Sequence, residues 1–212
     1  MARTFNNISN GPTSGLVTLD TTLTYPFTLV AWVVPFNATQ GGFPLCVYES
    51  ATTSKQSYLL QMTTNGWGAR SEGTNFLYSS GGGGLSTGVA YHLCGVWHQA
   101  NACKMYINGA LTGTGSSGSN PFNANRIYVG RSPTNTYSFH RGPMWEVGAW
   151  SRELTIGEIV ALSKRVSPRK MPHLLEFYSP LFTNNNPEQN YFGNLMTIAS
   201  DFTKTNQPAM YR

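Results

Sequence analysis

The chain has 212 residues, enough for one domain with a substantial core, and its composition is that of a protein built from short strands and turns. It contains 22 glycines, 12 prolines, 13% aromatic residues and 11% charged residues, whereas a helical bundle needs more Lys, Glu and Leu. The formal net charge of +5 is mild, so the sequence does not predict nucleic-acid binding. No run approaches the roughly 18 apolar residues of a membrane span, so it does not predict membrane insertion either.

The first third of the chain predicts successive strands separated by polar turns. A strand at Arg3-Thr-Phe is followed by a Gly-Pro turn and by a second strand at Leu16–Leu19. Between Pro26 and Pro35 both alternating faces are apolar or aromatic, which favours a strand covered on both sides in the middle of a sheet. Further strands are predicted at 43–50, 57–63, 67–72 and 75–79.

Residues 91–111 carry the clearest local pattern. Strands at 91–97 and 103–107 are joined by a polar turn, and Asn108-Gly109 makes a second turn, because this pair accepts the positive φ angles that tight hairpins require. Alternation places side chains of each strand on opposite faces, one of them apolar enough for a core. The residues predicted to be buried include Phe27, Leu29, Val96, Met105, Ile107 and Val129.

The rest of the chain predicts more strands and one short helix. Strands are predicted at 126–131 and 142–150. Thr155, with Glu158 three residues later, predicts a capped helix of two turns, which the following prolines end. Residues 174–182 predict an extended return strand.

Several of these segments, in this order, resemble concanavalin A-like domains of the laminin-G type. The segments are Pro26–Pro35, Tyr91-His92, Lys104–Leu111, Arg126–Arg131 and Gly142–Leu162. The resemblance implies an all-β fold, an antiparallel two-sheet jelly-roll sandwich with one short helix and a C-terminal extension. The opening Arg3-Thr-Phe-Asn, the segment Leu174–Leu181 and the terminal Pro208–Arg212 resemble members that bacteriophages encode.

We expect residues 1–182 to form the sandwich and residues 183–212 to form a C-terminal assembly tail. The tail has too many large apolar side chains to be left in water, and the sandwich has little surface left for it to cover. We therefore expect it to contact a neighbouring subunit or another virion protein, in a homo-oligomer. The residues predicted to make this contact are Tyr191, Phe192, Phe202, Met210 and Tyr211.

The acidic residues do not predict catalysis. Retaining glycanases of this fold use a Glu-x-Asp-x-x-Glu strand, and none of the nine acidic residues falls in such a motif. Glu146 follows Trp145 where the resembling family usually has Asp before Glu, and we expect a structural role for it, pairing with Arg141 or Arg152. The histidine spacing does not suit zinc, and with two Asp a calcium site would depend on Asn and backbone oxygens. No metal or other cofactor is predicted.

A carbohydrate site would use aromatic faces, against which sugar C–H groups stack, and amide side chains for the hydroxyl groups. Four residues in or beside predicted loops are candidates for glycan binding: Trp67, Tyr78, Tyr137 and His140. Their alternative role is packing in the core or in turns.

The leading functional hypothesis is a non-catalytic structural or adhesion protein of a bacteriophage virion, on the head or the tail. The N-terminus lacks the apolar region of a signal peptide, so we expect synthesis in the host cytoplasm and location in the virion, with virion proteins and a host glycan as partners. The alternatives are a carbohydrate-binding module, and a glycoside hydrolase or lyase with an atypical site.

Three cysteines, Cys46, Cys94 and Cys103, do not make a disulfide framework in a chain of this size. Free thiols are expected in a reducing cytoplasm. A bond between Cys94 and Cys103 across the hairpin is the alternative that the sequence leaves open.

Overall fold

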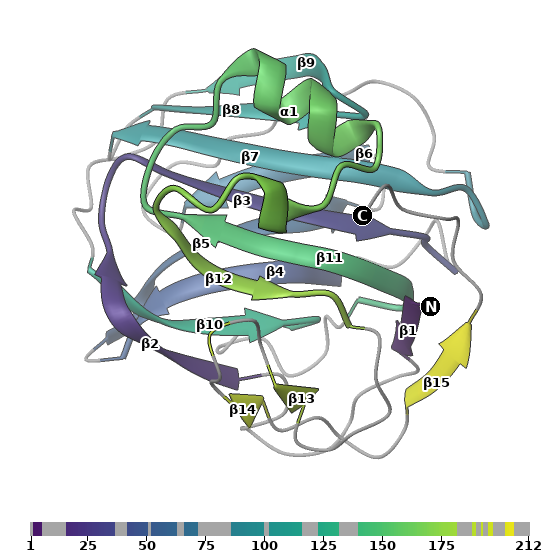
Figure 1. Ribbon diagram of the computed structural model, residues 1–212, viewed down its shortest axis with the longest axis horizontal. Helices are drawn as coiled ribbons and strands as arrows, with labels where there is room; N and C mark the ends of the chain where they lie inside the picture. The colour runs from purple at the N-terminus through teal and green to yellow at the C-terminus, as the bar shows by residue number, and fades with distance from the viewer. Residues whose placement is uncertain are drawn as a thin grey trace.

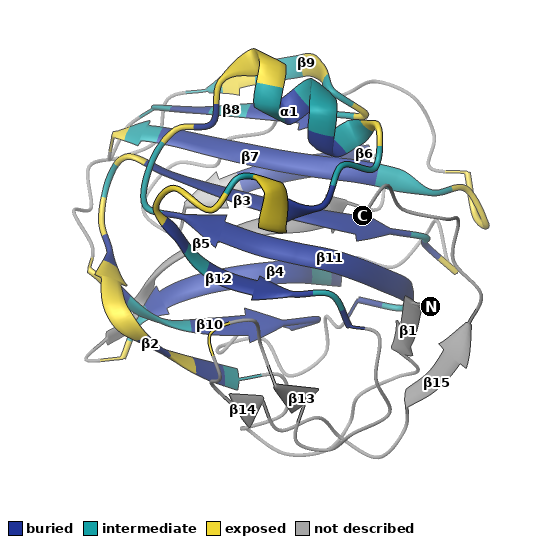
Figure 2. Cartoon of the chain, viewed as in Figure 1, coloured by how far each residue is buried: buried dark blue, intermediate teal, exposed yellow. Residues whose placement is uncertain are grey.

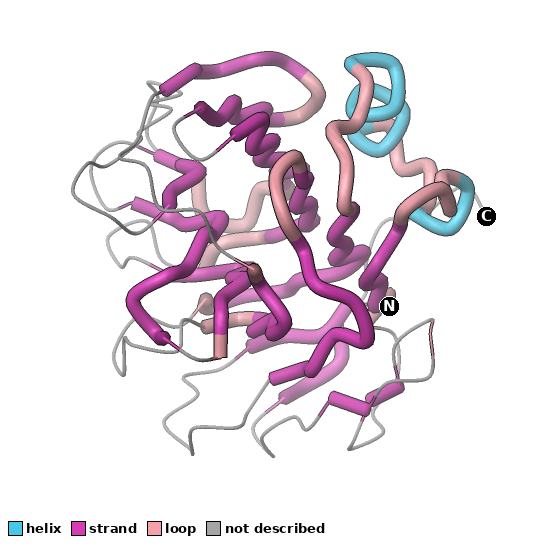
Figure 3. Tube along the Cα trace, turned by 90° about the vertical axis from the view of Figure 1, so that its left-hand side faces the viewer, coloured by secondary structure: helices cyan, strands magenta, loops and turns pink. Residues whose placement is uncertain are grey.

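The computed structural model describes residues 2–5, 16–36, 42–50, 52–62, 66–71, 86–99, 102–115, 123–131, 140–181, 188–189, 192, 195–196 and 202–205. Two antiparallel sheets pack face to face, and the helical segments lie on the outer side of the larger sheet (Figures 1 and 3). The predicted all-β jelly-roll sandwich with one short helix is confirmed. Among the described residues, no helix has the length and apolarity that a membrane crossing needs.

The larger sheet has eight strands. In chain order they are β1 (Ala2–Phe5), β3 (Phe27–Val33), β7 (Tyr91–Gln99), β8 (Ala102–Ile107), β9 (Ala110–Gly115), β11 (Gly142–Trp150), β12 (Leu175–Ser179) and β15 (Phe202–Thr205). In space their order is β15-β1-β11-β3-β7-β8-β9, and β12 also pairs with β11.

The smaller sheet has five strands. They are β2 (Leu16–Leu23), β4 (Gly42–Glu49), β5 (Thr52–Met62), β6 (Gly66–Ser71) and β10 (Ala124–Val129), in the spatial order β2-β10-β4-β5-β6. The short strands β13 (Glu188–Gln189) and β14 (Leu195–Met196) pair with each other. The helix α1 (Ile156–Ser163) is followed by a 3-10 turn, Pro168–Lys170.

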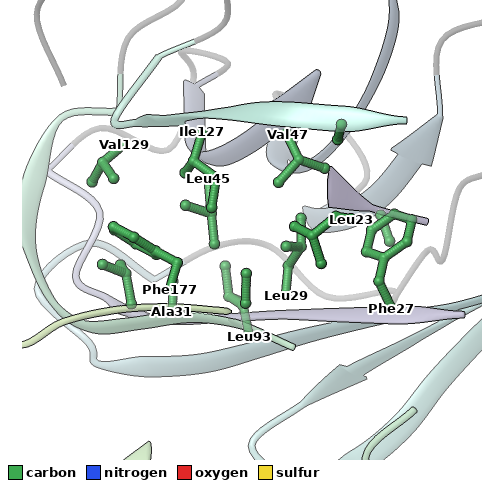
Figure 4. Close-up of a cluster of buried hydrophobic side chains, with 14 of the residues drawn as sticks. Leu23, Phe27, Leu29, Ala31, Leu45, Val47, Leu93, Ile127, Val129 and Phe177 are labelled. Atoms are coloured by element: carbon green, nitrogen blue, oxygen red, sulfur yellow. The ribbon is translucent and has the colours of Figure 1, made fainter. Parts of the chain in front are cut away.

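Alternation along each strand divides the larger sheet into an inner and an outer face. In β3, Leu29 and Ala31 point into the core between the sheets, whereas Val30 and Trp32 lie on the outer face. Figure 4 shows the two sets of core side chains that point toward one another, Leu45, Val47, Ile127 and Val129 from the smaller sheet and Leu29, Ala31, Leu93 and Phe177 from the larger. Because burying one such side chain is worth about 1.5–3 kcal/mol, this core holds the sandwich together.

The residues predicted to be buried divide between the two faces. Phe27, Met105 and Val129 lie in the core, together with Leu29. Val96 is buried but lies on the outer face, next to the helix, because β7 directs its alternate residues Leu93 and Trp97 inward. Ile107 is half-buried against the core rather than enclosed by it.

Helix α1 covers part of the outer face and begins with the predicted capping box. The Thr155 hydroxyl accepts a hydrogen bond from the Glu158 amide at 3.3 Å, and the Thr155 amide donates to the Glu158 carboxylate at 2.8 Å. Ile159 and Leu162 are buried and pack against the sheet. Arg152 donates to Glu158 at 2.7 Å, and this bond holds the pKa of Glu158 at about 2, which fixes the helix start to the end of β11.

Strand β11 has one extra residue opposite β3, and that residue is Glu146. Trp145 pairs with Trp32 and Gly148 with Val30, which leaves Glu146 in a bulge with a φ of 49°. The bulge lies where the partner along the other edge of β11 changes from β1 to β12. The bulge therefore allows β11 to pair first with β1 and then with β12 along the same edge.

The Glu146 carboxylate is buried and accepts hydrogen bonds from the Tyr178 hydroxyl at 2.8 Å and the Ser167 hydroxyl at 3.0 Å. Arg152, one of the two arginines predicted to pair with it, binds Glu158 instead. Tyr178 and Ser167 are partners of Glu146 that the sequence did not indicate, and a pairing with Arg141 stays a prediction. The contacts of Glu146 join β12 and the segment after α1 to the bulge.

The cysteines are buried thiols. Cys94 lies on the outer face of the hairpin and Cys103 in the core, so the two sulfur atoms point to opposite sides of the sheet and cannot form the cross-strand disulfide. Burial raises the pKa of Cys103 to about 12 and also raises that of Cys94, which suppresses the reactive thiolate at neutral pH.

The C-terminal region returns to the larger sheet. Strand β15 pairs antiparallel with β1, with Thr205 opposite Ala2 and Phe202 opposite Phe5. The expectation that the sandwich had little surface left for the tail is therefore wrong for residues 202–205. A boundary between residues 182 and 183 stays a prediction.

Candidate functional site

One end of the sandwich, where β3 ends and β7 and β11 begin, is fastened by backbone hydrogen bonds. The Phe36 amide donates to the Arg141 carbonyl at 3.0 Å, and the Gly88 amide donates to the Pro35 carbonyl at 3.0 Å. Segments far apart in the sequence are thereby held side by side. We call this region the Phe36 end; it comprises residues 34–36, 86–91 and 140–143.

A glycine makes the close approach of these segments possible. Gly142 has a φ of 126°, and a Cβ atom there would lie 1.9 Å from the Val34 carbonyl oxygen and 3.2 Å from the Phe36 nitrogen. The Val34 amide donates to the Pro143 carbonyl at 2.8 Å, directly beside this contact. Residue 142 therefore has to be glycine for the backbone beneath Phe36 to keep its position.

The Phe36 end presents apolar side chains to solvent. Phe36 is 51% exposed and Val89 is 45% exposed, on either side of the bond between Gly88 and Pro35. Figure 2 shows the exposed stretch that leads into β7 at the right of the molecule. An exposed aromatic ring on a fixed backbone can stack against the C–H face of a sugar without losing much conformational freedom on binding.

The Phe36 end also contains residues with polar side-chain groups. The Tyr91 hydroxyl is at hydrogen-bond distance from the Ser86 amide, 3.2 Å, and the Tyr91 side chain is half-buried. Arg141 is also half-buried. A hydroxyl and a guanidinium at the same end of the sandwich as an exposed aromatic ring are groups that can fix the orientation of a bound sugar.

Three rings close the core below the Phe36 end. The Trp67 ring lies 6.3 Å from the Tyr91 ring and 6.5 Å from the His140 ring, centroid to centroid. Trp67 is 1% exposed and His140 is fully buried. Burial lowers the pKa of His140 to about 4, against a smaller opposing effect of a hydrogen bond with the Pro143 backbone, so its imidazole is neutral at pH 7.

Two predicted glycan-binding residues, Trp67 and His140, are thus brought together, but inside the molecule. Neither buried ring offers a face to a ligand, so their positions agree with the alternative role of packing in the core. The reason is that alternation along β6 directs Trp67, like Ala69, into the core. Its indole is large enough for burial to outweigh any polar contact at the surface.

The other two predicted residues, Tyr78 and Tyr137, lie outside the described residues. They belong to the stretches 72–85 and 132–139, which join the Phe36 end directly at Ser86 and His140. Sequence reasoning missed Phe36 itself. The available signal was its place just after Pro35, where the alternation of β3 has ended and a large apolar side chain has no predicted core position.

A second aromatic cluster lies on the outer face of the smaller sheet. Tyr48 and Tyr128 stack with ring centroids 5.2 Å apart and an angle of 4° between the rings, and the Arg131 guanidinium lies 5.0 Å from the Tyr128 centroid. Both tyrosines are buried, and burial is the main cause of the raised pKa of Tyr48. Their faces contact each other and Arg131, so this cluster offers less to a sugar than Phe36 does.

The described part of the chain holds no group of three or more His, Cys, Asp or Glu side chains placed to bind a metal ion. Of the residues predicted to contact a partner, Phe192 is 44% exposed and Phe202 belongs to β15. Tyr191, Met210 and Tyr211 lie outside the described residues.

Comparison with protein families matches residues 10–160 to the concanavalin A-like lectin/glucanase superfamily. The chain belongs to this superfamily. No curated protein sequence matches the chain.

Solved structures agree on the fold. A heptameric, SAP-like pentraxin of Limulus polyphemus superposes with a TM-score of 0.64 at 17% identity, covering 94% of this chain and 95% of the pentraxin. A proposed carbohydrate-binding protein of Bacteroides ovatus gives a TM-score of 0.70 at 15% identity, covering 99% of this chain but 61% of that protein. Domain 4 of the arabinanase AbnA of Geobacillus stearothermophilus, in complex with arabinotriose, gives 0.53 at 17% identity and 68% coverage of each chain. At sequence identities of 15–17%, the similarity to these structures shows a shared fold.

Proposed function

We propose that this chain is a non-catalytic, lectin-like module that binds a carbohydrate at the Phe36 end. The observation that carries the proposal is the exposed Phe36 ring on a backbone that cross-strand hydrogen bonds hold in place. Membership of the concanavalin A-like superfamily supports it, as do fold neighbours described as a proposed carbohydrate-binding protein and as an arabinanase domain with bound arabinotriose.

In this mechanism the Phe36 ring stacks on the apolar face of a pyranose or furanose, and Val89 extends the apolar contact. The Tyr91 hydroxyl and the Arg141 guanidinium then bond to sugar hydroxyl groups at the edge of the ring. Binding needs no proton transfer and no metal ion. Specificity comes from the polar groups, since an aromatic face stacks on many sugars.

A glycan array on the purified chain tests the proposal, with Phe36→Ala as the test variant. The matched control is Leu111→Ala, because Leu111 is 53% exposed but lies in β9, the edge strand beyond β8. We expect the wild-type protein and Leu111→Ala to bind the same glycans, and Phe36→Ala to lose that binding. Equal binding by Phe36→Ala would exclude the Phe36 end, and a wild-type chain that binds nothing would exclude the function.

The role in a bacteriophage virion stays a prediction from the sequence, as do the virion location and the oligomer. Mass spectrometry of purified particles tests it, because a virion protein has to be present in them. The glycoside hydrolase or lyase alternative is tested by incubating the chain with a panel of polysaccharides and looking for released products.

A further inference from the structure

Phe36 and Arg141 are neighbours across the two chain segments that meet at the Phe36 end. Val33 is opposite Met144 in the pairing of β3 with β11. Three residues further along each segment, the Phe36 amide donates to the Arg141 carbonyl at 3.0 Å, so the same register continues past the end of β3. Phe36 is therefore directly opposite Arg141.

This pairing brings an aromatic ring and a cation within reach of one ligand. Directly opposite residues of an antiparallel pair share a face of the sheet, with Cβ atoms about 4.5–5.5 Å apart. Phe36 is 51% exposed and Arg141 is half-buried, so each residue keeps part of its surface accessible to solvent. A sugar that stacks on the Phe36 ring therefore lies within reach of the Arg141 guanidinium.

The backbone beneath the two side chains is held by further hydrogen bonds. The Gly88 amide, in the segment before β7, donates to the Pro35 carbonyl at 3.0 Å. On the other side, the His140 amide donates to the Gly130 carbonyl at 2.9 Å, which ties the residue before Arg141 to the end of β10. A ligand that meets such a fixed backbone has little main-chain ordering to impose when it binds.

The charge of the Phe36 end is positive. Arg141 is the one charged side chain that the described residues of this end contain. His140 beside it is neutral at pH 7, because burial lowers its pKa to about 4. In the sequence, the stretches that continue from this end, 37–41, 72–85 and 132–139, contain one acidic residue between them. This distribution of charge favours an anionic ligand over a cationic one.

A carboxylate is the sugar group that suits this arrangement best. A guanidinium presents its N–H donors in a planar fork that matches the two oxygens of a carboxylate. Such charge-assisted hydrogen bonds are stronger than bonds to neutral hydroxyl groups. Uronic and sialic acids carry a carboxylate at the edge of a ring that also has an apolar C–H face, so one sugar residue offers both contacts.

We infer that the Phe36 end binds acidic sugars, with the Phe36 ring stacked on the sugar and the Arg141 guanidinium paired with its carboxylate. This inference rests on the proposed carbohydrate function and adds the class of sugar to it. Phe36 contributes affinity for acidic and neutral sugars alike, and Arg141 sets the preference between them. Because a hydrogen bond to a charged group is stronger than one to a neutral group, we expect a preference of about tenfold.

Calorimetric titration of the full-length protein with matched pairs of glycans tests the inference. The probes are an oligogalacturonide and sialyllactose, each beside a derivative whose carboxylates have been reduced to alcohols. The wild-type protein should bind the acidic member of a pair about tenfold more tightly than its derivative. In Arg141→Gln the ratio of the two affinities should fall to about one, whereas Phe36→Ala should weaken the binding of both members.

The matched control is Lys104→Gln, which removes one positive charge elsewhere on the sheet. Lys104 is also half-buried, and it is opposite Val96, five residues along β7 from Tyr91. This variant should keep the wild-type ratio. If Arg141→Gln failed to fold, the wild-type protein would decide, because added salt has to weaken the binding of the acidic member more than that of its derivative.

The outcomes separate this inference from the function on which it rests. Equal affinity of the wild-type protein for both members of each pair overturns the inference and leaves the proposed function standing. A preference that persists in Arg141→Gln also overturns it, because another group then recognises the carboxylate. A wild-type chain that binds neither these probes nor any glycan of the array overturns the proposed function as well.

Discussion

Replacing Gly142 by Ala should be one of the most damaging single-methyl changes in the described part of this chain. The added Cβ would lie 1.9 Å from the Val34 carbonyl oxygen, a contact that a backbone atom cannot relieve by rotating. The positive φ of 126° adds about 1–2 kcal/mol for a residue with a Cβ. Separating the strands to relieve the contact would weaken two backbone hydrogen bonds, each worth about 1 kcal/mol, those of Val34 and Phe36.

The sum predicts a loss of about 3–4 kcal/mol in the free energy of unfolding. Urea denaturation followed by far-UV circular dichroism measures it, and at a slope of about 2 kcal/mol/M the midpoint should fall by about 1.5–2 M. The Phe36 end should loosen as well, so any carbohydrate affinity should fall with the stability.

Two other glycines serve as controls for this prediction. Gly88 has a φ of 77° but nothing within 4 Å of its Cβ position, so Gly88→Ala should cost about 1–2 kcal/mol from the backbone conformation alone. Gly157 lies in α1 with only the Thr155 hydroxyl 4.0 Å away, so Gly157→Ala should stabilise the protein by up to about 1 kcal/mol. If Gly142→Ala cost no more than Gly88→Ala, the steric argument would be refuted.

Three further predictions concern buried and paired groups. Tyr178→Phe removes the 2.8 Å hydrogen bond to the buried carboxylate of Glu146 and should lower the free energy of unfolding by about 1.5–3 kcal/mol in the same urea assay. An unchanged urea midpoint would show that this hydrogen bond does not stabilise the fold. The pKa of Glu158 falls from 4.5 to about 2 on folding, so its stabilising contribution is present above pH 4.5 and is lost as the pH falls toward 2. Glu158→Gln should remove this part of the pH dependence of thermal unfolding. The pKa of His92 falls from 6.5 to about 3 on folding, so the unfolded chain binds the proton first and the free energy of unfolding should decrease as the pH drops below 6.5. His92→Asn should flatten that decrease. An identical pH profile for the variant would contradict the burial of a neutral ring.

Local patterns along the sequence determined most of the secondary structure. Asn108 and Gly109 have φ angles of 52° and 84°, as the turn between β8 and β9 requires, and the His92 amide donates to the Asn108 side chain at 2.8 Å to close the hairpin. The helix began at the predicted capping box of Thr155 and Glu158. These features depend on neighbouring residues and on periodicity, which a sequence displays directly.

The sequence also determined which residues share a face, but only the tertiary structure decided what covers each face. Val96 was predicted to be buried and is buried, yet under the helix rather than between the sheets. Trp67 and His140 lie close together, and the alternation of β6 directs the indole into the core rather than to a ligand. Alternation defines two faces of a strand and cannot say which one meets the other sheet.

Contacts between distant segments were beyond the reach of sequence reasoning. The hydrogen bonds of Glu146 with Ser167 and Tyr178 depend on a bulge that lets β1 and β12 share one edge of β11. The exposure of Phe36 depends on the close approach at Gly142, and the place of β15 depends on its pairing with a strand two hundred residues away in the chain. The sequence by itself determined the superfamily, most of the described strands and their two faces. The tertiary structure decided the edge partners, the bulge and the exposed ring, because these follow from the packing of segments whose distance in space has no local signature.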